Sequence, residues 1–307
     1  MNMSSIHKLE ELFGDRFQQN VRMANYTTSR VGGLVLGLLP ANTLDDLRHA
    51  SETFWKLEVP FKVIGSGANI LVSDKGYEGV ILLNRCHNIK IFSQEDTPFI
   101  YTESGANFGA MARQTALRGL TGLEWANSIP GTVGGAVYGN AGAHGWDVAR
   151  ALISTRIFFK DSGEHELSAE DMAYTYRSSV LKREHTLAVI LSATFTAQKS
   201  TREKAWAKLN EFAAQRQATQ PGGASTGSTF KNPVDDYAGR LIEAAGLKGH
   251  TEGHACFSSL HANFIVNDGT ANAHEYYTLI KLAQKRVKDL FGIDLELEIE
   301  LLGDFND

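Results

Sequence analysis

The sequence is poor in features that mark secreted, membrane-spanning and metal-binding proteins. Its 307 residues include only two cysteines, Cys86 and Cys256, so neither a disulfide framework nor a cysteine-based metal site is expected. The most apolar window, residues 31–41, is interrupted by glycines and is shorter than the roughly 20 residues that span a bilayer. The N-terminal stretch contains acidic residues and lacks the apolar core of a secretory signal. We therefore expect a cytoplasmic protein with no membrane partner.

Positive charge is also scarce. The chain has 30 lysines and arginines against 35 aspartates and glutamates, a net charge of −5, and no stretch forms a basic face. Proteins that bind nucleic acid in general carry such a face, so no nucleic-acid partner is expected. His250 and His254 lie four apart with Glu252 between them, but the neighbouring glycines disfavour a helix that would align them. No metal site is expected.

Two common kinds of enzyme site are disfavoured. Neither glycine-rich stretch has the form GxGxxG followed by a helix and a ribose-binding acid, which disfavours a Rossmann site for NAD. The stretch GASTG at residues 223–227 has the form GxSxG, but it lies in a predicted loop at 219–229 and not in a turn between a strand and a helix, and the sequence places no histidine or acid where it would activate Ser228. A hydrolase with a catalytic triad is therefore not expected.

Glycine is concentrated in residues 122–145, which read GLEWANSIPGTVGGAVYGNAGAHG and hold seven glycines. No ordinary helix or strand is expected there, because glycine costs about 1 kcal/mol relative to alanine inside a helix. Backbone without side chains can approach a phosphate or a flat ring closely. A second glycine-rich turn, residues 65–69, follows an apolar strand-like run at 61–64. A surface loop is the simpler alternative for either stretch, but the pair predicts a nucleotide cofactor.

The remaining pattern mixes helices and strands. The predicted helices span residues 5–18, 42–57, 107–118, 200–216 and 236–245. The predicted strands span residues 61–64, 79–83, 89–92, 99–103, 151–159, 187–197, 262–267 and 293–301. Ser200 and Glu203 fit a capping box where the sequence changes character, which predicts a domain boundary. A last helix is predicted between Asn272, its cap, and Gly292, with Glu275 at the third helical position.

The final predicted strand alternates strictly between apolar and acidic residues. The apolar set is Leu295, Leu297, Ile299 and Leu301, and the acidic set is Asp294, Glu296, Glu298 and Glu300. A half-buried strand with a solvated acidic face is the simplest interpretation. A carboxylate that faces a closed cleft would instead have a raised pKa and act as an acid. The alternation does not say which of the four that would be.

Two further polar stretches have both a structural and a catalytic interpretation. Arg177, in the sequence YRSS, is either a surface or ion-pair residue or a fixed positive charge for a developing oxyanion or enolate. Ser228, in the sequence GSTFKNP, is either a loop residue or a proton donor.

Taken together, the longer motifs occur in the order of one known family. They are GSGANILV, GLEWANSIPGTVGGAVYGNAGAHG, YRSS, GSTFKNP, AGRLIEAAGLKG, HANFIVN and GIDLELEIELLG. From about residue 25 to residue 303 the chain resembles the bacterial UDP-N-acetylenolpyruvoylglucosamine reductases (MurB), flavoenzymes of peptidoglycan precursor synthesis. The short interval between Arg177 and Ser228 resembles the subclass that lacks an extra substrate-capping loop.

The resemblance implies an α+β protein with an FAD-binding fold of the vanillyl-alcohol oxidase type and a smaller α+β C-terminal substrate domain. The FAD-binding domain is expected at residues 1–199, with subdomains at about 1–84 and 85–199. The substrate domain is expected at residues 200–307, with its last strand contributing Glu298.

The resemblance also implies a reaction. NADPH reduces a non-covalently bound FAD, and the reduced flavin passes hydride to the enolpyruvyl group of UDP-N-acetylglucosamine enolpyruvate, which gives UDP-N-acetylmuramate. This flavoprotein oxidoreductase would serve cell wall biogenesis, and so cell shape and cell division. Arg177 and Glu298 are expected to stabilise the enolate intermediate and Ser228 to protonate it. The resemblance thus selects Glu298 from four acids that alternation alone leaves equivalent.

The binding residues follow from the same resemblance. Expected to contact FAD are Gly65, Ser66, Gly67, Ala68, Asn69, Ile70, Pro130, Gly131, Thr132, Gly134, Gly135, Asn140, Ala141 and Gly142. Expected to contact the sugar nucleotide are Tyr176, Arg216 and Asn232.

The chain departs from the family pattern in three places that concern the substrate. QPGG followed by ASTGS stands where QPL with PSAGS is common, with Ser225 and Ser228 retained. Leu34-Val35-Leu36 stands where Pro-Ala-Asp is common, and Leu260 stands where a lysine is common. Two alternatives stay open: an FAD oxidase or dehydrogenase of the same fold, disfavoured because no histidine lies in a motif for covalent flavin attachment, and a catalytically silent homologue that binds a sugar nucleotide. The sequence does not give the oligomeric state; a monomer is expected.

Overall fold

The computed structural model of the chain describes residues 3–306 and divides into two compact units. Unit 1 comprises the described residues up to Phe17 together with Leu38–Gly65 and Ile81–Arg216. Unit 2 comprises Gln18–Gly37, Ser66–Val80 and the described residues from Gln217 onward. The chain passes between the units five times: after Phe17, after Gly65, and inside β2 (Leu34–Ala41), β5 (Tyr77–Asn84) and α7 (Arg202–Thr219). The predicted division at residue 200 stays a prediction.

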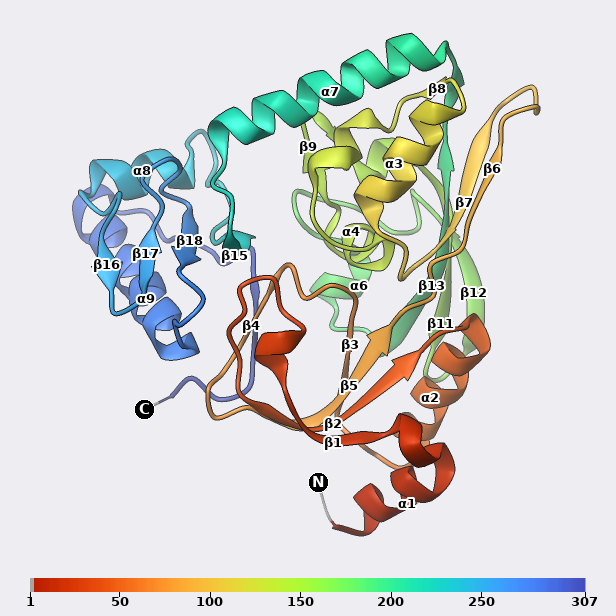
Figure 1. Ribbon diagram of the computed structural model, residues 1–307, viewed down its shortest axis with the longest axis horizontal. Helices are drawn as coiled ribbons and strands as arrows, with labels where there is room; N and C mark the ends of the chain where they lie inside the picture. Colours follow the sequence, from red (N-terminus) through yellow and green to blue (C-terminus); the bar gives the residue numbers. More distant parts are fainter. Residues whose placement is uncertain (1–2, 307) are drawn as a thin grey trace. The chain divides into compact units, whose positions relative to one another are not determined.

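Unit 1 holds most of the helices and strands of the described chain (Figure 1). Its helices are α1 (Met3–Phe13), η1 (Gly14–Arg16), α2 (Leu44–Lys56), α3 (Phe108–Leu117), η3 (Glu124–Ser128), α4 (Val133–Gly139), α5 (Val148–Ala151), α6 (Val180–Arg183) and most of α7. Its strands are β3 (Phe61–Ile64), β6 (Ile89–Phe92), β7 (Phe99–Glu103), β8 (Leu120–Thr121), β9 (Gly142–Ala143), β10 (Trp146–Asp147), β11 (Leu152–Phe159), β12 (Gly163–Ser168), β13 (Ala188–Thr196) and β14 (Gln198–Lys199).

The core of unit 1 lies on an antiparallel five-stranded sheet of order β12-β11-β13-β7-β6. Phe108 of α3 packs edge-on against Trp125 of η3 and at a tilt against Phe195 of β13, and all three side chains are buried. Aromatic side chains of this size dominate the apolar area that a core removes from water. β3, β6 and β7 have the bounds that the sequence predicts.

The glycine-rich stretch contains a helix that was not predicted. Val133–Gly139 forms α4, which ends at Asn140 in the left-handed conformation (φ 47°). A side chain on Gly134 would meet Ser104, since an added Cβ would lie 3.0 Å from the Ser104 Cβ and 3.1 Å from its carbonyl oxygen. The Gly134 N–H donates to that same carbonyl at 2.7 Å. The expectation of no helix was wrong because close tertiary packing outweighs the low helix propensity of glycine.

The start of α7 also differs from the prediction. The helix begins at Arg202, and the hydroxyl of Thr201 accepts the N–H of Lys204 at 3.3 Å. The predicted capping box between Ser200 and Glu203 is therefore wrong. Thr201 caps the helix in place of Ser200, because its hydroxyl lies one residue closer to the helix, and the residue three positions after Thr201 is Lys204 and not an acid.

Unit 2 is built on an antiparallel sheet of order β15-β18-β17-β16, with α9 packed against it (Figure 1). The elements within it are β1 (Gln18–Arg22), η2 (Met23–Asn25), β4 (Ile70–Val72), β15 (Ala224–Ser228), α8 (Ala238–Ala244), β16 (Thr251–Glu252), β17 (Ala255–Phe257), β18 (Phe264–Asn267), α9 (Ala273–Phe291) and β19 (Glu300–Leu302).

The long helix α9 has the ends that the sequence predicts. Asn272 and Glu275 form the capping box, and Gly292 ends the helix at φ 70°. Tyr276, Ile280 and Val287 recur on one face and are fully buried in the core of unit 2. This spacing is that of an amphipathic helix lying on a sheet.

The last predicted strand is wrong in its extent. Only Glu300–Leu302 forms a strand, β19, which pairs with β4 in parallel. Before it, the chain pairs irregularly: Leu297 forms a single bridge with Phe230, and the Glu298 N–H donates to the Thr229 carbonyl at 2.9 Å. Glu298 therefore precedes the last strand and does not lie within it. The alternation was still informative, because Leu295 and Ile299 are buried.

Among residues 3–306, no helix combines the length and apolar character that crossing a membrane would need. No group of three or more His, Cys, Asp or Glu side chains in this range is arranged to hold a metal ion.

Candidate functional site

The two glycine-rich stretches meet inside unit 1. An added Cβ on Gly65 would lie 2.3 Å from the Thr132 hydroxyl oxygen and 2.5 Å from the Thr132 methyl carbon. Such distances are well inside van der Waals contact, so only glycine fits at position 65 while Thr132 keeps its place. The first predicted cofactor turn thus begins against the centre of the second.

Three glycines spaced four apart leave the backbone near α4 bare. Among the described residues, a Cβ added to Gly131 or Gly139 would meet no atom within 4 Å, and one added to Gly135 would meet only the Thr132 hydroxyl at 3.9 Å. The N–H groups of Val133 and Gly134 point elsewhere, because they donate to the carbonyls of Ala106 and Ser104. The segment therefore offers a surface without side chains, which a flat ring or a diphosphate can approach without obstruction. These residues fit a dinucleotide such as FAD.

Within unit 2, the rest of the first glycine turn is held by the N-terminal segment. Gly67 has φ 63°, and an added Cβ would lie 2.2 Å from the Tyr26 carbonyl oxygen. The Gly67 carbonyl accepts the N–H of Thr28 at 3.2 Å. Asn69 donates from its side chain to the Glu298 carbonyl at 3.0 Å and accepts the Glu300 N–H at its own carbonyl. The turn is thereby tied to the segment that carries the predicted acid.

Ser228 lies at the end of β15, where it pairs with Phe264 of β18. The residue is half-buried, and its hydroxyl makes no hydrogen bond to any residue of the described chain. The hydroxyls of Thr226 and Thr229, on either side, are buried and have no partner within residues 3–306. Since buried polar groups nearly always find a partner, these orphan hydroxyls favour a site that a polar ligand or water completes.

Glu298 is half-buried, and its backbone is paired with Thr229, the residue after Ser228. The fold of unit 2 therefore brings the predicted acid and the predicted proton donor onto neighbouring segments. The other acids differ: Asp294 is exposed beside Lys288 at 2.6 Å, and Glu296 is exposed beside Lys231 at 3.1 Å. Asp294 and Glu296 are thus exposed in surface ion pairs, which distinguishes them from the half-buried Glu298.

Arg177 lies in unit 1, in a turn that follows Tyr174. It has φ 55° and is half-buried, and its guanidinium Nη2 donates to the Gly142 carbonyl at 3.1 Å. The guanidinium carbon also lies 5.1 Å from the centre of the Tyr176 ring, a cation–π distance. The guanidinium is thus a fixed positive charge. That Arg177 converges with Ser228 and Glu298 stays a prediction, because they belong to the other unit.

The predicted substrate residues have different surroundings. Tyr176 is 52% exposed. Arg216 is half-buried, and burial lowers its pKa. The side-chain oxygen of Asn232 accepts the Ala238 N–H at 3.1 Å, at the start of α8. Their contacts with a sugar nucleotide stay predictions.

The sequence analysis did not single out His144, which lies in unit 1 beside α7. Its ring stacks on that of Phe212, with centroids 4.2 Å apart and an interplanar angle of 14°. Burial is the main cause of a lowered pKa for His144, and the charge of Arg216 lowers it further. The only signal in the sequence is its place in the NAGAHG motif.

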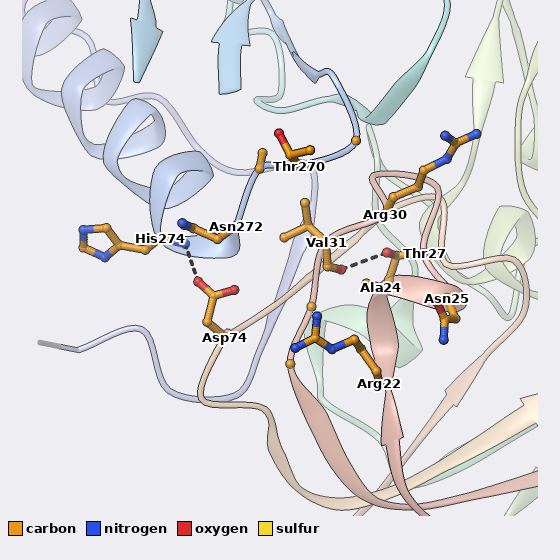
Figure 2. Close-up of a pocket in the computed structure, with 14 residues that line it drawn as sticks. Arg22, Ala24, Asn25, Thr27, Arg30, Val31, Asp74, Thr270, Asn272 and His274 are labelled. Atoms are coloured by element: carbon orange, nitrogen blue, oxygen red, sulfur yellow. Dashed lines mark hydrogen bonds between the residues drawn. The ribbon is translucent and has the colours of Figure 1, made fainter. Parts of the chain in front are cut away.

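A cavity of about 1000 Å³ lies within unit 2, between the N-terminal segment and the start of α9 (Figure 2). The Asp74 carboxylate accepts the N–H groups of Ala273 and His274 there, at 2.9 and 2.8 Å. The first amides of α9 are therefore already capped. Figure 2 shows Arg22 and Arg30 on the cavity wall with their guanidinium groups pointing apart. None of the predicted site residues lines this cavity.

Two stretches of the chain match known protein families. Residues 35–166 match an FAD-binding domain, and residues 217–302 match the C-terminal domain of UDP-N-acetylenolpyruvoylglucosamine reductase. The chain is 41% identical over 283 residues to the UDP-N-acetylenolpyruvoylglucosamine reductase of Chloroflexus aurantiacus, which covers 91% of this chain and 95% of that protein. It belongs to the UDP-N-acetylenolpyruvoylglucosamine reductase family.

Other members of the family agree. The enzyme of Anoxybacillus flavithermus is 40% identical, with 93% of this chain and 94% of that protein covered. The crystal structure of the reductase (MurB) from Thermus caldophilus matches with a TM-score of 0.78 and 32% identity, over 92% of this chain and 98% of that one. The predicted α+β class and the FAD-binding fold of the vanillyl-alcohol oxidase type are thereby confirmed, and so is FAD as the cofactor.

Proposed function

We propose that the protein is an FAD-dependent oxidoreductase that reduces UDP-N-acetylglucosamine enolpyruvate to UDP-N-acetylmuramate with NADPH, in peptidoglycan precursor synthesis. The observation that carries this proposal is the 41% identity, over 91% of the chain, to the UDP-N-acetylenolpyruvoylglucosamine reductase of Chloroflexus aurantiacus. The match of residues 35–166 to an FAD-binding domain supports FAD as the cofactor.

The bare backbone beside α4 is proposed to hold the cofactor. Gly131, Gly135 and Gly139 leave room there for a flat ring system or for a diphosphate. When bound, FAD supplies the hydride that it has received from NADPH. The protein residues then have to align the substrate and deal with the charge that hydride addition leaves on it.

Arg177 and Glu298 are proposed to stabilise that charge. Addition of hydride to the enolpyruvyl group leaves enolate character next to the substrate carboxylate. A guanidinium stays cationic at any relevant pH, and one held at the Gly142 carbonyl needs little reorganisation when the charge develops. A protonated Glu298 would donate a hydrogen bond to the enolate oxygen. Both roles require the two side chains to reach the same substrate.

Ser228 is proposed to deliver the proton that completes the reaction. An alcohol is a weak acid, so it donates only to a carbon that has become strongly basic in the intermediate. The Ser228 hydroxyl makes no hydrogen bond within the described chain, which leaves its proton available for the substrate.

We also propose a substrate class, a location, an oligomeric state and a domain boundary. The substrate is a UDP-sugar, the protein acts as a cytoplasmic monomer, and the functional domains divide near residue 200. Light scattering on the purified protein would give its mass, and limited proteolysis would find the domain boundary.

Purified protein tests the proposed reaction directly. It should be yellow with non-covalent flavin, and NADPH oxidation should depend on added UDP-N-acetylglucosamine enolpyruvate. Bound flavin with no substrate-dependent NADPH oxidation would overturn the proposal. It would favour an oxidase with another substrate or a silent sugar-nucleotide-binding protein.

A further inference from the structure

Arg177 lies in a tight turn whose backbone geometry is unfavourable for its residue type. Thr175 and Ser178 close the turn by exchanging two backbone hydrogen bonds, of 3.0 and 3.1 Å. Arg177 itself has φ 55°, in the left-handed region that few residues with a side chain adopt. Conformations of this kind persist when the surroundings hold them in place. Neighbouring groups must therefore hold this turn.

The turn is fastened to the short segment 138–142, which runs from the end of α4 into β9, and the Arg183 guanidinium also donates to the Thr175 hydroxyl at 3.2 Å. Three hydrogen bonds join the two: the Asn140 side-chain Nδ2 donates to the Thr175 carbonyl at 3.0 Å, the Ser179 hydroxyl to the Tyr138 carbonyl at 2.7 Å, and the Arg177 guanidinium to the Gly142 carbonyl at 3.1 Å. We call residues 138–142 the platform. Both the platform and the turn belong to unit 1.

Asn140 is the central residue of the platform. It is 4% exposed, and its own left-handed conformation (φ 47°) ends α4. Its side-chain oxygen accepts the N–H of Ala149 at 3.0 Å while its nitrogen donates to Thr175. Because an N–H can only meet the amide oxygen, the Ala149 contact fixes which end of the side chain faces the turn. Both ends of this buried amide are therefore used inside the protein.

We propose that Asn140 is a positioning residue for Arg177, which holds the turn so that the guanidinium meets the enolate in a fixed place. The inference rests on the proposed role of Arg177. It also gives Asn140 a purpose other than the contact with FAD that the sequence predicts. Preorganised charge is effective only when its position is fixed, and a displacement of about 1 Å can slow a reaction about 100-fold.

Asn140→Asp is the most selective change. It keeps the shape, tolerates the left-handed conformation and retains the acceptor for Ala149, but it loses the donor to the Thr175 carbonyl. We expect unchanged flavin content and unchanged reduction of the flavin by NADPH. The substrate half-reaction should slow about 10- to 100-fold, in kcat and not in KM. Asn140→Gly removes the whole side chain, and glycine adopts positive φ freely, so it serves as a second variant if the aspartate folds poorly.

A double-mutant cycle separates positioning from general damage. If Asn140 acts through Arg177, then Asn140→Asp should add little to the slow substrate half-reaction of Arg177→Ala. Asn84 provides a matched control in unit 1: it is 6% exposed, its Nδ2 donates to the Ser104 hydroxyl at 2.7 Å, and its oxygen accepts the Cys86 N–H at 3.0 Å. The effect of Asn84→Ala on the substrate half-reaction should combine additively with that of Arg177→Ala.

The outcomes distinguish this inference from the proposed function on which it rests. Suppose that Arg177→Ala slows the substrate half-reaction and that Asn140→Asp slows it further by its full single-variant factor. This additive result would overturn the positioning role alone. So would loss of flavin in Asn140→Asp with the control variant still loaded, because Asn140 would then be a cofactor residue. Substrate reduction at the wild-type rate in Arg177→Ala would instead overturn the proposed role of Arg177.

Discussion

The two units hold their predicted catalytic side chains in different ways. In unit 1, the position of Arg177 depends on side-chain hydrogen bonds. Asn140 of the platform donates to the Thr175 carbonyl of the turn, and the Ser179 hydroxyl donates to the Tyr138 carbonyl of the platform. In unit 2, Glu298 depends on backbone pairing with Thr229 and lies in sequence between the partly buried Leu297 and the buried Ile299. The guanidinium should therefore be sensitive to single polar substitutions nearby, whereas the position of the acid should be sensitive mainly to loss of packing.

The largest effect is expected from Ser228→Ala. Flavin reduction by NADPH should continue, while product formation should slow about 1000-fold because general acid catalysis contributes roughly 10²- to 10⁴-fold. Stopped-flow measurement of the two half-reactions checks this. Equal losses in both half-reactions would mean that Ser228 is needed for binding or folding and not for protonation.

Phe230→Ala tests whether packing holds the backbone pairing in unit 2. Phe230 is fully buried and bridges Leu297, so its truncation should cost about 3–4 kcal/mol of unfolding free energy. Urea unfolding followed by circular dichroism measures the loss. Val234→Ala is the control, since Val234 is 89% exposed and should leave the midpoint unchanged. If Phe230→Ala lowers the unfolding free energy by less than about 1 kcal/mol, the backbone pairing does not depend on this ring.

Arg177→Lys tests whether the exact position of the positive charge in unit 1 matters. Lysine keeps the positive charge but lacks the planar fork that reaches the Gly142 carbonyl. The substrate half-reaction should slow about 100-fold, about 2.7 kcal/mol of transition-state stabilisation, with flavin reduction unaffected. Wild-type rates in the lysine variant would indicate that charge alone matters and that the fixed geometry of the turn does not.

The smallest effect concerns pH and His144. Burial lowers the pKa of this histidine from its ordinary 6.5, so the unfolded chain binds a proton more readily than the folded protein does. Its contribution to stability is therefore fully present above pH 6.5 and is lost as the pH falls through that value toward the lower folded pKa. Thermal melts at pH 7.5 and 5.5 should show a smaller difference for His144→Gln than for the parent protein. An identical difference in the two proteins would rule out this origin.

Local patterns predicted the elements whose ends are set by local chemistry. β3, β6 and β7 lie between turn residues and have the expected bounds, and α9 has its capping box at Asn272 with Gly292 beyond its end. Helix α4 could not be predicted in the same way. It exists because Gly134 packs onto Ser104, a residue thirty positions earlier, and no local pattern reports such a contact.

The candidate site shows the same limit. Alternation left four acids equivalent, and their difference comes from partners far along the chain, such as Lys231 for Glu296. The last strand was predicted too long because residues 293–299 have no continuous partner edge, although their apolar residues alternate as in a strand. The sequence predicted Asn140 as part of a motif, but its amide binds the carbonyl of Thr175, 35 positions away.

The contact between Gly65 and Thr132 constrains how this protein can evolve. A methyl group at position 65 would overlap the threonine side chain, whose hydroxyl does not cap α4. Alanine at 65 should thus be harmful beside Thr132 and acceptable beside a glycine there. The order of the two substitutions matters: a lineage that acquires alanine at 65 has to lose the threonine first.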